Sequence, residues 1–297
     1  SFPTRRSSDC EFNIVKAPNG DLYAVNINNN WKETYRSSDQ GLSWQRLSFL
    51  EQFFPGEKNK QVFVTEAGTV YLSIPIQNAL YKTTNDGQSW STANRFDLEL
   101  ASGVLLKREN NAILRSADSG QNWSSVLDYP IGTIYSYAFN NTIYGGLLFE
   151  CKWKLANGDS TSTLYRSLDE GVSWTTQDID PHFEGFFIAP SNTILCTKEY
   201  ILYRSVDGGL SFQSTGVTTD YAPSFTVLPS GRILMQPFNG VLQYSDDDGI
   251  SWDTLATSKE GSGGYFQRLK PLPDGSILKN YRNALMRSID GGLSWQF

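Results

Sequence analysis

The sequence predicts an all-β protein, a seven-bladed β-propeller built from four-stranded antiparallel blades. A ten-residue pattern at positions 35–44, YRSSDQGLSW, returns six more times along the 297 residues. The number of residues between successive copies is typical of one four-stranded propeller blade. The segments between the copies contain short strands bounded by turn residues, and they lack helical periodicity. These three observations together indicate the fold class.

The repeated pattern, called the box below, has the core Ser/Thr-x-Asp-x-Gly-x-Ser-Trp. Its aspartate can accept hydrogen bonds from backbone N–H groups of its own turn, and the glycine supplies a positive φ. The tryptophan begins the next strand and has a large apolar area to bury. We therefore expect a structural role for the residue at the aspartate position of each copy: Asp39, Asn85, Asp118, Asp169, Asp207, Asp247 and Asp290.

This core resembles the Asp-box, or BNR repeat, of sialidase-like and related β-propellers, and the resemblance extends from Tyr35 to Trp295. It is shared with sortilin-type receptors and photosystem II assembly factors, in which a bare propeller binds protein or peptide. Xyloglucanases use the same repeats, but their catalytic carboxylates lie across two propellers. The seven boxes of this chain make up only one propeller, so the resemblance implies protein or peptide binding as one of its expected functions.

The strands of individual units follow from their apolar runs and turn residues. In the first unit we expect strands at 12–17, 22–25, 33–37 and 42–47, with a turn at 18–21. The box is then the turn between the third and fourth strands. The sixth unit repeats this order at 225–229, 232–236, 241–245 and 250–252, and the seventh at 266–272, 276–279, 284–288 and 293–296.

The spacing of the boxes predicts two irregular blades. The intervals between aspartate positions are 46, 33, 51, 38, 40 and 43 residues, which average about 42 and suit four short strands. The shortest unit leaves little room for its first strand, which we expect near 96–100. The longest unit should carry an extended hairpin around 150–163. No strand is visibly shared between the ends, so either packing of the end blades closes the ring or the native protein continues beyond this chain.

Residues 1–9 resemble the translation of a sequencing adaptor, and we expect them to be a non-native leader. Residues 10–297 should form one domain. Because we expect the native start to be missing, this domain could be part of a longer protein. The chain has no apolar run long enough for a membrane span, so none is expected. We expect a monomer that is secreted, periplasmic or on the cell surface.

Composition narrows the partners and cofactors. The net charge is −6, without a Lys/Arg-rich run after the first residues, which argues against nucleic acid as a partner. Three cysteines and one histidine provide neither a disulfide framework nor a zinc spacing. The aspartates at 246–248 lack the glutamate that closes an EF-hand loop. We therefore expect no metal and no cofactor.

The ligand site is expected on the face opposite the boxes. In a propeller the boxes share one face with the turns between first and second strands, and ligands usually bind the other face, where loops converge on the channel. Cations and aromatic rings recur where the second strand ends. They could bind an anionic glycan or an acidic peptide. The alternative is that these residues form a solvated rim of polar loops. The expected binding residues are Lys107, Arg108, Lys152, Trp153, Lys198, Tyr200, Tyr281 and Arg282.

A sialidase is the enzymatic alternative. The family resemblance would require an arginine triad, an acidic proton donor and a Tyr/Glu nucleophile pair, with a Phe/Tyr-Arg-Ile-Pro signature before the first box. That signature is absent, and the nearest string, 72–75, has Ser73 in place of arginine. We therefore favour a binding module for a glycan or a protein/peptide ligand over a glycoside hydrolase, and assign no catalytic residue. Five arginines recur at one box position, which suits scaffolding: Arg36, Arg115, Arg166, Arg204 and Arg287.

Overall fold

The computed structural model describes most of the chain. The described residues are 12–17, 19–26, 34–47, 61–65, 67–74, 77–85, 88–129, 133–141, 146–154, 158–219, 223–237, 241–255, 269–272, 274–281 and 284–296. The expected leader lies outside these ranges, as do the strand residues predicted at 266–268.

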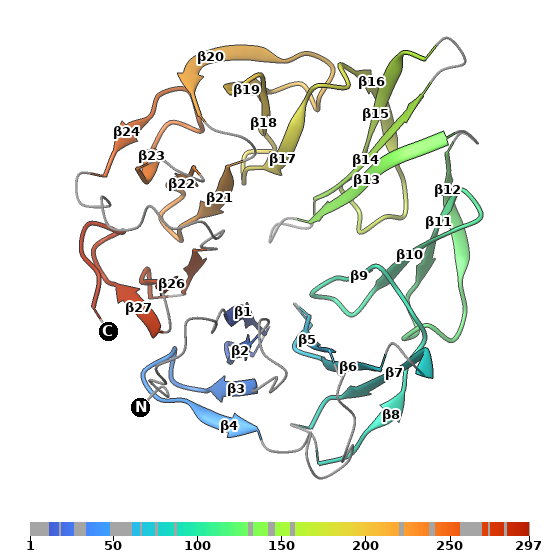
Figure 1. Ribbon diagram of the computed structural model, residues 1–297, viewed down its shortest axis with the longest axis vertical. Helices are drawn as coiled ribbons and strands as arrows, with labels where there is room; N and C mark the ends of the chain where they lie inside the picture. The colour runs from blue at the N-terminus through green and yellow to red at the C-terminus, as the bar shows by residue number, and fades with distance from the viewer. Residues whose placement is uncertain are drawn as a thin grey trace.

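Seven antiparallel sheets form a ring, which confirms the predicted seven-bladed propeller. Figure 1 shows the first strand of a blade, such as β1, β5 or β17, nearest the centre of the ring. Within each blade, strands that follow one another in the chain are hydrogen-bonded neighbours. No α-helix occurs in the described ranges. The described residues contain no helix with the length and apolar character that crossing a membrane requires.

The first three blades comprise β1 to β12. Their strands are β1 Phe12–Lys16, β2 Leu22–Asn26, β3 Thr34–Ser37 and β4 Gln45–Leu47; β5 Gln61–Val64, β6 Val70–Ile74, β7 Ala79–Thr83 and β8 Ser91–Thr92; and β9 Leu98–Glu99, β10 Leu105–Glu109, β11 Ala112–Ser116 and β12 Ser124–Asp128.

The next three blades comprise β13 to β24. Their strands are β13 Thr133–Asn141, β14 Leu147–Lys154, β15 Ser160–Ser167 and β16 Thr175–Ile179; β17 Glu184–Ile188, β18 Ile194–Lys198, β19 Ile201–Ser205 and β20 Gln213–Thr218; and β21 Ser224–Val227, β22 Ile233–Gln236, β23 Gln243–Ser245 and β24 Asp253–Thr254.

The seventh blade has three strands, β25 Lys270–Pro271, β26 Ile277–Tyr281 and β27 Ala284–Ser288. A fourth segment begins where the sequence predicts it, because Arg287 and Gln296 exchange two backbone hydrogen bonds of 2.7 and 2.9 Å. The two irregular blades are also as predicted: β9 lies within 96–100, and β14 and β15 form the long hairpin. The fourth strands begin later than expected, at Gln45 rather than residue 42, because the box turn extends through Trp44.

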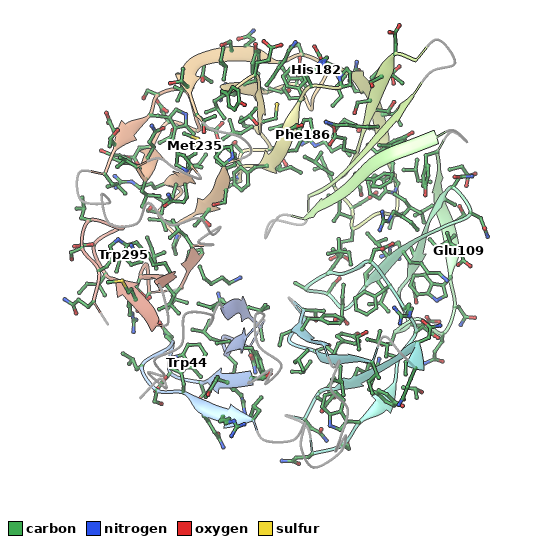
Figure 2. All side chains as sticks on the ribbon, in the orientation of Figure 1. Trp44, Glu109, His182, Phe186, Met235 and Trp295 are labelled. Carbon is green, nitrogen blue, oxygen red and sulfur yellow. The ribbon has the colours of Figure 1, made fainter. Side chains whose placement is uncertain are left out.

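The core lies between blades rather than in one central cluster. Six of the seven interfaces have described clusters of buried aliphatic side chains from the facing sheets, and Figure 2 shows side chains between neighbouring blades around the ring. The first and last blades meet in the same way, because Ile14 and Leu22 pack with Leu272 and Leu278. All four are buried, and burial of one such side chain is worth about 1.5–3 kcal/mol. Packing of the end blades therefore closes the ring.

The box turns are held by a repeated set of hydrogen bonds. In the first box the Ser43 backbone N–H donates to Asp39 Oδ1 at 2.8 Å, and the Ser43 hydroxyl donates to Oδ2 at 2.5 Å. The Trp44 indole N–H donates to the Gly41 carbonyl at 3.0 Å. Gly41 has a φ of 86°, and Gln40 before it also has a positive φ of 58°. The turn therefore needs two consecutive left-handed residues, which explains why glycine is fixed at the second.

These bonds make the box aspartates stronger acids. Hydrogen bonds from Ser43, first from its side chain and then from its backbone, lower the pKa of Asp39 to about 2. The same arrangement lowers the pKa to about 2 in five other boxes, those of Asp118, Asp169, Asp207, Asp247 and Asp290. Asn85 keeps the geometry without a charge, since its Oδ1 accepts from the Ser89 N–H at 3.0 Å.

Replacing Asp290 with alanine should destabilise the protein by about 1–3 kcal/mol, because the Ser294 N–H and two hydroxyls lose their acceptor. Replacing it with asparagine should cost much less, since asparagine already serves at position 85. Urea unfolding of both variants measures the difference. Equal destabilisation by alanine and asparagine would show that the hydrogen bonds to the first carboxyl oxygen do not hold the turn.

Two of the recurring box arginines connect neighbouring turns. Arg115 donates to the Glu170 carbonyl of the next box at 2.9 Å. Arg204 likewise donates to the Asp248 carbonyl and carboxylate, both at 2.9 Å. Arg36 pairs instead with Asp21 of its own blade at 2.6 Å. These contacts support the scaffolding interpretation for Arg36, Arg115 and Arg204.

Candidate ligand-binding site

A pocket of about 760 Å³ lies between the second and third blades. Its position follows from the shortest repeat unit. Strand β8 has only two residues, after which the chain crosses to the third blade, with Ala93 N bonded to Leu80 O at 2.8 Å and Asp97 N to Leu106 O at 2.9 Å. Residues 94–97 of this crossing segment line the pocket together with residues from both blades. The segment that follows the short fourth strand thus forms part of the pocket wall.

One wall of the pocket is aromatic. Phe63 and Phe96 line it, with ring centroids 6.2 Å apart. Both pack on the buried Tyr71, Phe63 in a stacked pair at 5.2 Å and Phe96 edge-on at 4.9 Å. Aromatic pairs of this kind gain energy beyond burial alone. Tyr71 therefore fixes the two rings from behind and leaves their other sides toward the pocket.

A buried carboxylate stands behind this wall. Glu99 on β9 accepts hydrogen bonds from the hydroxyls of Thr65, Thr69 and Tyr71 in the second blade. Burial raises the pKa of Glu99, and burial together with this carboxylate raises the pKa of Tyr71. The interface between these two blades is thus joined by polar groups as well as by rings, which positions the pocket walls.

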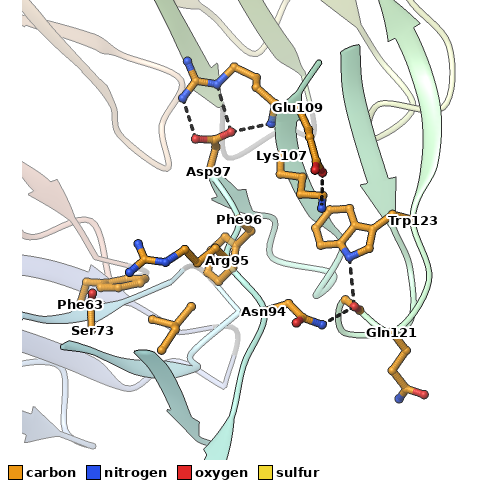
Figure 3. A pocket seen from close by; sticks show the side chains of 13 residues that line it. Phe63, Ser73, Asn94, Arg95, Phe96, Asp97, Lys107, Glu109, Gln121 and Trp123 are labelled. Atoms are coloured by element: carbon orange, nitrogen blue, oxygen red, sulfur yellow. Dashed lines mark hydrogen bonds and ion pairs between the residues drawn. The ribbon is translucent and has the colours of Figure 1, made fainter. Parts of the chain in front are cut away.

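Two of the predicted binding residues line this pocket, Lys107 and Arg108, and both are paired within the protein. Arg108 makes a bidentate ion pair with Asp97, at 2.6 and 3.0 Å. Lys107 pairs with Glu109 at 2.6 Å and stands 4.6 Å from the centre of the Trp123 ring. Figure 3 shows Asp97, Lys107 and Glu109 at the same end of the pocket. A ligand must therefore compete with these carboxylates for the two cations.

The cation left for a ligand is Arg95, which sequence reasoning missed. It is exposed, lines the pocket and forms no ion pair with any residue of the described ranges. Figure 3 shows its side chain in front of Phe96, reaching toward Phe63. With Lys107, Arg108, Asp97 and Glu109 it gives the pocket three cations and two carboxylates. The signal in the sequence was the 33-residue interval, which places Arg95 on a crossing segment rather than at a strand end.

The remaining predicted residues lie in other blades. Lys152 is buried and donates to the Phe183 carbonyl at 2.9 Å. Lys198 pairs with Asp180, whose carboxylate also contacts His182 at 2.7 Å. Tyr200 is 62% exposed at a hairpin tip and has a positive φ of 65°. For the other three, the structure gives only backbone positions or none: Trp153 in β14, Tyr281 in β26, and Arg282 outside the described residues.

The pocket matches the predicted face only in part. Glu109 lies at the end of β10, on the face opposite the boxes, whereas Gly120 and Gln121 belong to the third box turn. The pocket therefore runs between the faces along the interface of two blades. In the described ranges, no group of three or more His, Cys, Asp or Glu residues is arranged to hold a metal ion.

Comparison with known proteins supports the fold. No family model matches the chain, and no curated protein matches it. Among solved structures it is similar to YCF48 bound to D1 peptide, with a TM-score of 0.64, 14% identity and coverage of 96% of this chain and 93% of that one. YCF48 from Cyanidioschyzon merolae gives a TM-score of 0.60 at 14% identity, covering 96% of this chain and 97% of that one.

A third structure is virginiamycin B lyase from Staphylococcus aureus with quinupristin, with a TM-score of 0.58, 13% identity and coverage of 96% of each chain. At these identities the likeness establishes the propeller fold and does not transfer a function. The molecule is thus a seven-bladed β-propeller with an aromatic, weakly cationic pocket between two blades. Among its structural neighbours, YCF48 is seen with a bound peptide.

Proposed function

We propose that this propeller is a binding module that holds a segment of a peptide or protein in the pocket between the second and third blades. The observation that carries the proposal is Arg95, a cation without an ion pair in the described ranges, beside an aromatic wall in a pocket of about 760 Å³. An apolar residue of the peptide would contact Phe63 and Phe96, and a neighbouring carboxylate would bind Arg95 through charge-assisted hydrogen bonds. YCF48, which shares the fold, is seen with a peptide bound.

An anionic glycan is the second ligand class. Trp123 is the ring on which a sugar would stack, but the Lys107 ammonium stands 4.6 Å from its centre. This contact favours a peptide over a glycan. Lys198 and Tyr200, on the hairpin of the fifth blade, remain proposed as additional ligand contacts. We also infer that the seven turns are Asp-boxes, on the strength of their repeated aspartate and tryptophan hydrogen bonds.

A glycoside hydrolase remains the alternative. Of the two arginines lining the pocket, Arg108 is already bound to Asp97, so a sialidase-like arginine triad is not assembled among the described lining residues. Hydrolysis of fluorogenic glycosides by the purified protein would favour the alternative. We further propose that the protein is an exported monomer, which light scattering and fractionation of the producing cells can test.

Charge reversal by Arg95→Glu should weaken binding of acidic peptides at least tenfold, since about 1.4 kcal/mol of lost attraction suffices. The probe is an array of synthetic decapeptides that pair an aspartate, a glutamate or a free C-terminal carboxylate with a neighbouring leucine or phenylalanine. Arg46→Glu, on the outer strand β4, is the matched control with the same change of charge. If both variants weaken binding equally, net charge rather than the pocket explains the effect.

A steric variant tests the pocket without altering its charge. Gln121 is exposed and lines the pocket, so Gln121→Trp should fill part of it and lower peptide affinity at least tenfold. Gln88→Trp places the same ring at the same box position of the second blade, outside the pocket lining, and should leave binding intact. Titration of one selected peptide by calorimetry compares them. Undiminished binding by Gln121→Trp would exclude this pocket as the site.

A further inference from the structure

Apolar side chains are exposed at one repeat position of five neighbouring box turns. This position follows the box glycine, and in the fourth to seventh blades and the first it carries a leucine, valine or isoleucine. These side chains are between 47% and 75% exposed: Val172, Leu210, Ile250, Leu293 and Leu42. A single exposed aliphatic residue needs no explanation, but recurrence at equivalent positions of adjacent blades does.

A second position adds to the same surface. Immediately before the box aspartate stand Leu168, Val206 and Ile289, which are 58%, 69% and 73% exposed. Three of the five turns therefore present two apolar side chains each. These three residues and the five of the previous paragraph are together called the box-face arc.

The turn itself does not require these apolar residues. The second and third blades carry Gln88 and Gln121 after the box glycine. The third turn nevertheless has the same hydrogen bonds as the others, with Asn122 N bonded to Asp118 at 2.9 Å and the Trp123 indole to Gly120 at 3.0 Å. Since a polar residue serves the fold equally well, the apolar choice in the other five turns points to a contact outside the fold.

The turns of the arc are neighbours in space. Arg204 of the fifth box binds Asp248 of the sixth, and a Cβ added to Gly208 of the fifth box would lie 2.6 Å from an Arg166 nitrogen of the fourth. The first and seventh blades meet through their buried aliphatic cluster. The exposed apolar residues thus follow the ring over five consecutive blades rather than lying at unrelated places.

The charge around the arc indicates what can cover it. Every one of the five turns contains a box aspartate whose pKa is lowered to about 2. With Glu170, Asp246 and Asp248, the carboxylates of these turns outnumber their four box arginines, Arg36, Arg166, Arg204 and Arg287. A second copy would bring the same acidic face against this one, and an anionic membrane would be repelled. A protein surface with apolar side chains bordered by lysine or arginine complements the arc in both respects.

We propose that the box-face arc is a docking surface for a second protein that presents apolar side chains bordered by basic residues. This contact lies on the box turns of five blades, apart from the peptide pocket between the second and third. It would allow the propeller to hold a partner protein while the pocket holds a peptide. The proposal does not rest on the pocket function, and the two can fail separately.

The test replaces four arc residues with the residue that the second and third blades already use. The variant Val172→Gln, Leu210→Gln, Ile250→Gln, Leu293→Gln should fold like the parent, which urea unfolding checks. The probes are three synthetic amphipathic helical peptides with Leu/Lys, Leu/Glu and Gln/Lys faces. The parent should bind the Leu/Lys peptide at least tenfold more tightly than the other two, and the variant should lose at least tenfold of that affinity. Arg95→Ala, which alters the pocket away from the box turns, should leave this binding unchanged.

Four results would overturn the proposal. Absence of binding to the Leu/Lys peptide, or equal binding by parent and variant, would show that the arc is not the contact. Concentration-dependent dimerisation of the parent that the variant loses would assign the arc to a second copy. Sedimentation of the parent with phosphatidylglycerol vesicles, abolished in the variant, would assign it to a membrane surface.

Discussion

Lys152→Met is expected to destabilise the protein by about 3–5 kcal/mol, which is the cost of leaving one partner of a buried ion pair unpaired. Lys152 and Glu150 project from β14 toward the fifth blade, with side chains only 8% and 9% exposed and charged atoms 3.4 Å apart. The ammonium also donates to the Phe183 carbonyl at 2.9 Å. The methionine would leave both the carboxylate and the carbonyl without this donor.

The loss of stability should be large because the carboxyl group of Glu150 is buried beside Lys152. Burial raises its pKa, and the Lys152 charge is the main factor that opposes this rise. The Ser162 hydroxyl, at 3.1 Å, is the other donor to this carboxylate. Without Lys152, the carboxyl must either stay charged in an apolar interface or take up a proton at neutral pH. Both outcomes favour unfolding.

Urea unfolding of three variants separates this explanation from a general loss of packing. Glu150→Gln combined with Lys152→Met removes both charges and should recover much of the stability. Lys198→Met removes a partly exposed pair with Asp180 and should cost less than about 1 kcal/mol. If Lys152→Met melts like the parent, Lys152 is accessible to solvent, and its predicted role as a ligand-binding residue would be strengthened.

The fold could be predicted because the box turn is specified within ten residues. Asp39, Gly41 and Trp44 make their decisive hydrogen bonds within their own turn. The pattern therefore reports local structure without knowledge of the neighbouring blades. The distance between successive turns then fixes the number and approximate length of the strands. Ring closure could not be predicted, because Ile14 and Leu272 contact each other only once all blades are in place.

The site was less predictable because side-chain direction alternates along a strand. Cations at strand ends were expected to face a ligand, yet Lys152 faces the next blade and Arg108 faces Asp97. Each partner lies elsewhere in the chain. The Phe183 carbonyl belongs to the fifth blade, and Asp97 directly precedes β9. Arg95 shows the converse: its place in the pocket depends on the early end of β8, a consequence of the short unit that no single motif displays.

Acid should unfold the protein in a steep transition between about pH 4 and pH 2. The pKa of six box aspartates falls from 3.8 to about 2 in the folded state. A carboxyl with a lowered folded pKa contributes stability that is fully present above its unfolded pKa and is lost as the pH falls through the folded value. Because six turns titrate together, the losses add within one narrow window.

Two buried carboxyls act in the opposite direction. Burial raises the pKa of Glu99 and of Glu150 above 4.5, so their protonation stabilises the folded state as the pH falls toward that value. Stability should therefore change little, or rise, from pH 7 to about pH 5 before the box aspartates dominate below pH 4. Urea midpoints at pH 7, 5, 4, 3 and 2 would trace this curve.

Asp207→Asn identifies the groups responsible. Asparagine keeps the acceptor that Ser211 N uses at 3.0 Å, as Asn85 does in the second box, but it does not titrate. The variant should therefore take up nearly one proton fewer on unfolding near pH 3, which appears as a shallower dependence of stability on pH. The control is Asp253→Asn, an exposed carboxyl on β24 outside the box turns. If the parent's stability is flat between pH 4 and pH 2, or if both variants alter the slope equally, the box aspartates are not the source of acid sensitivity.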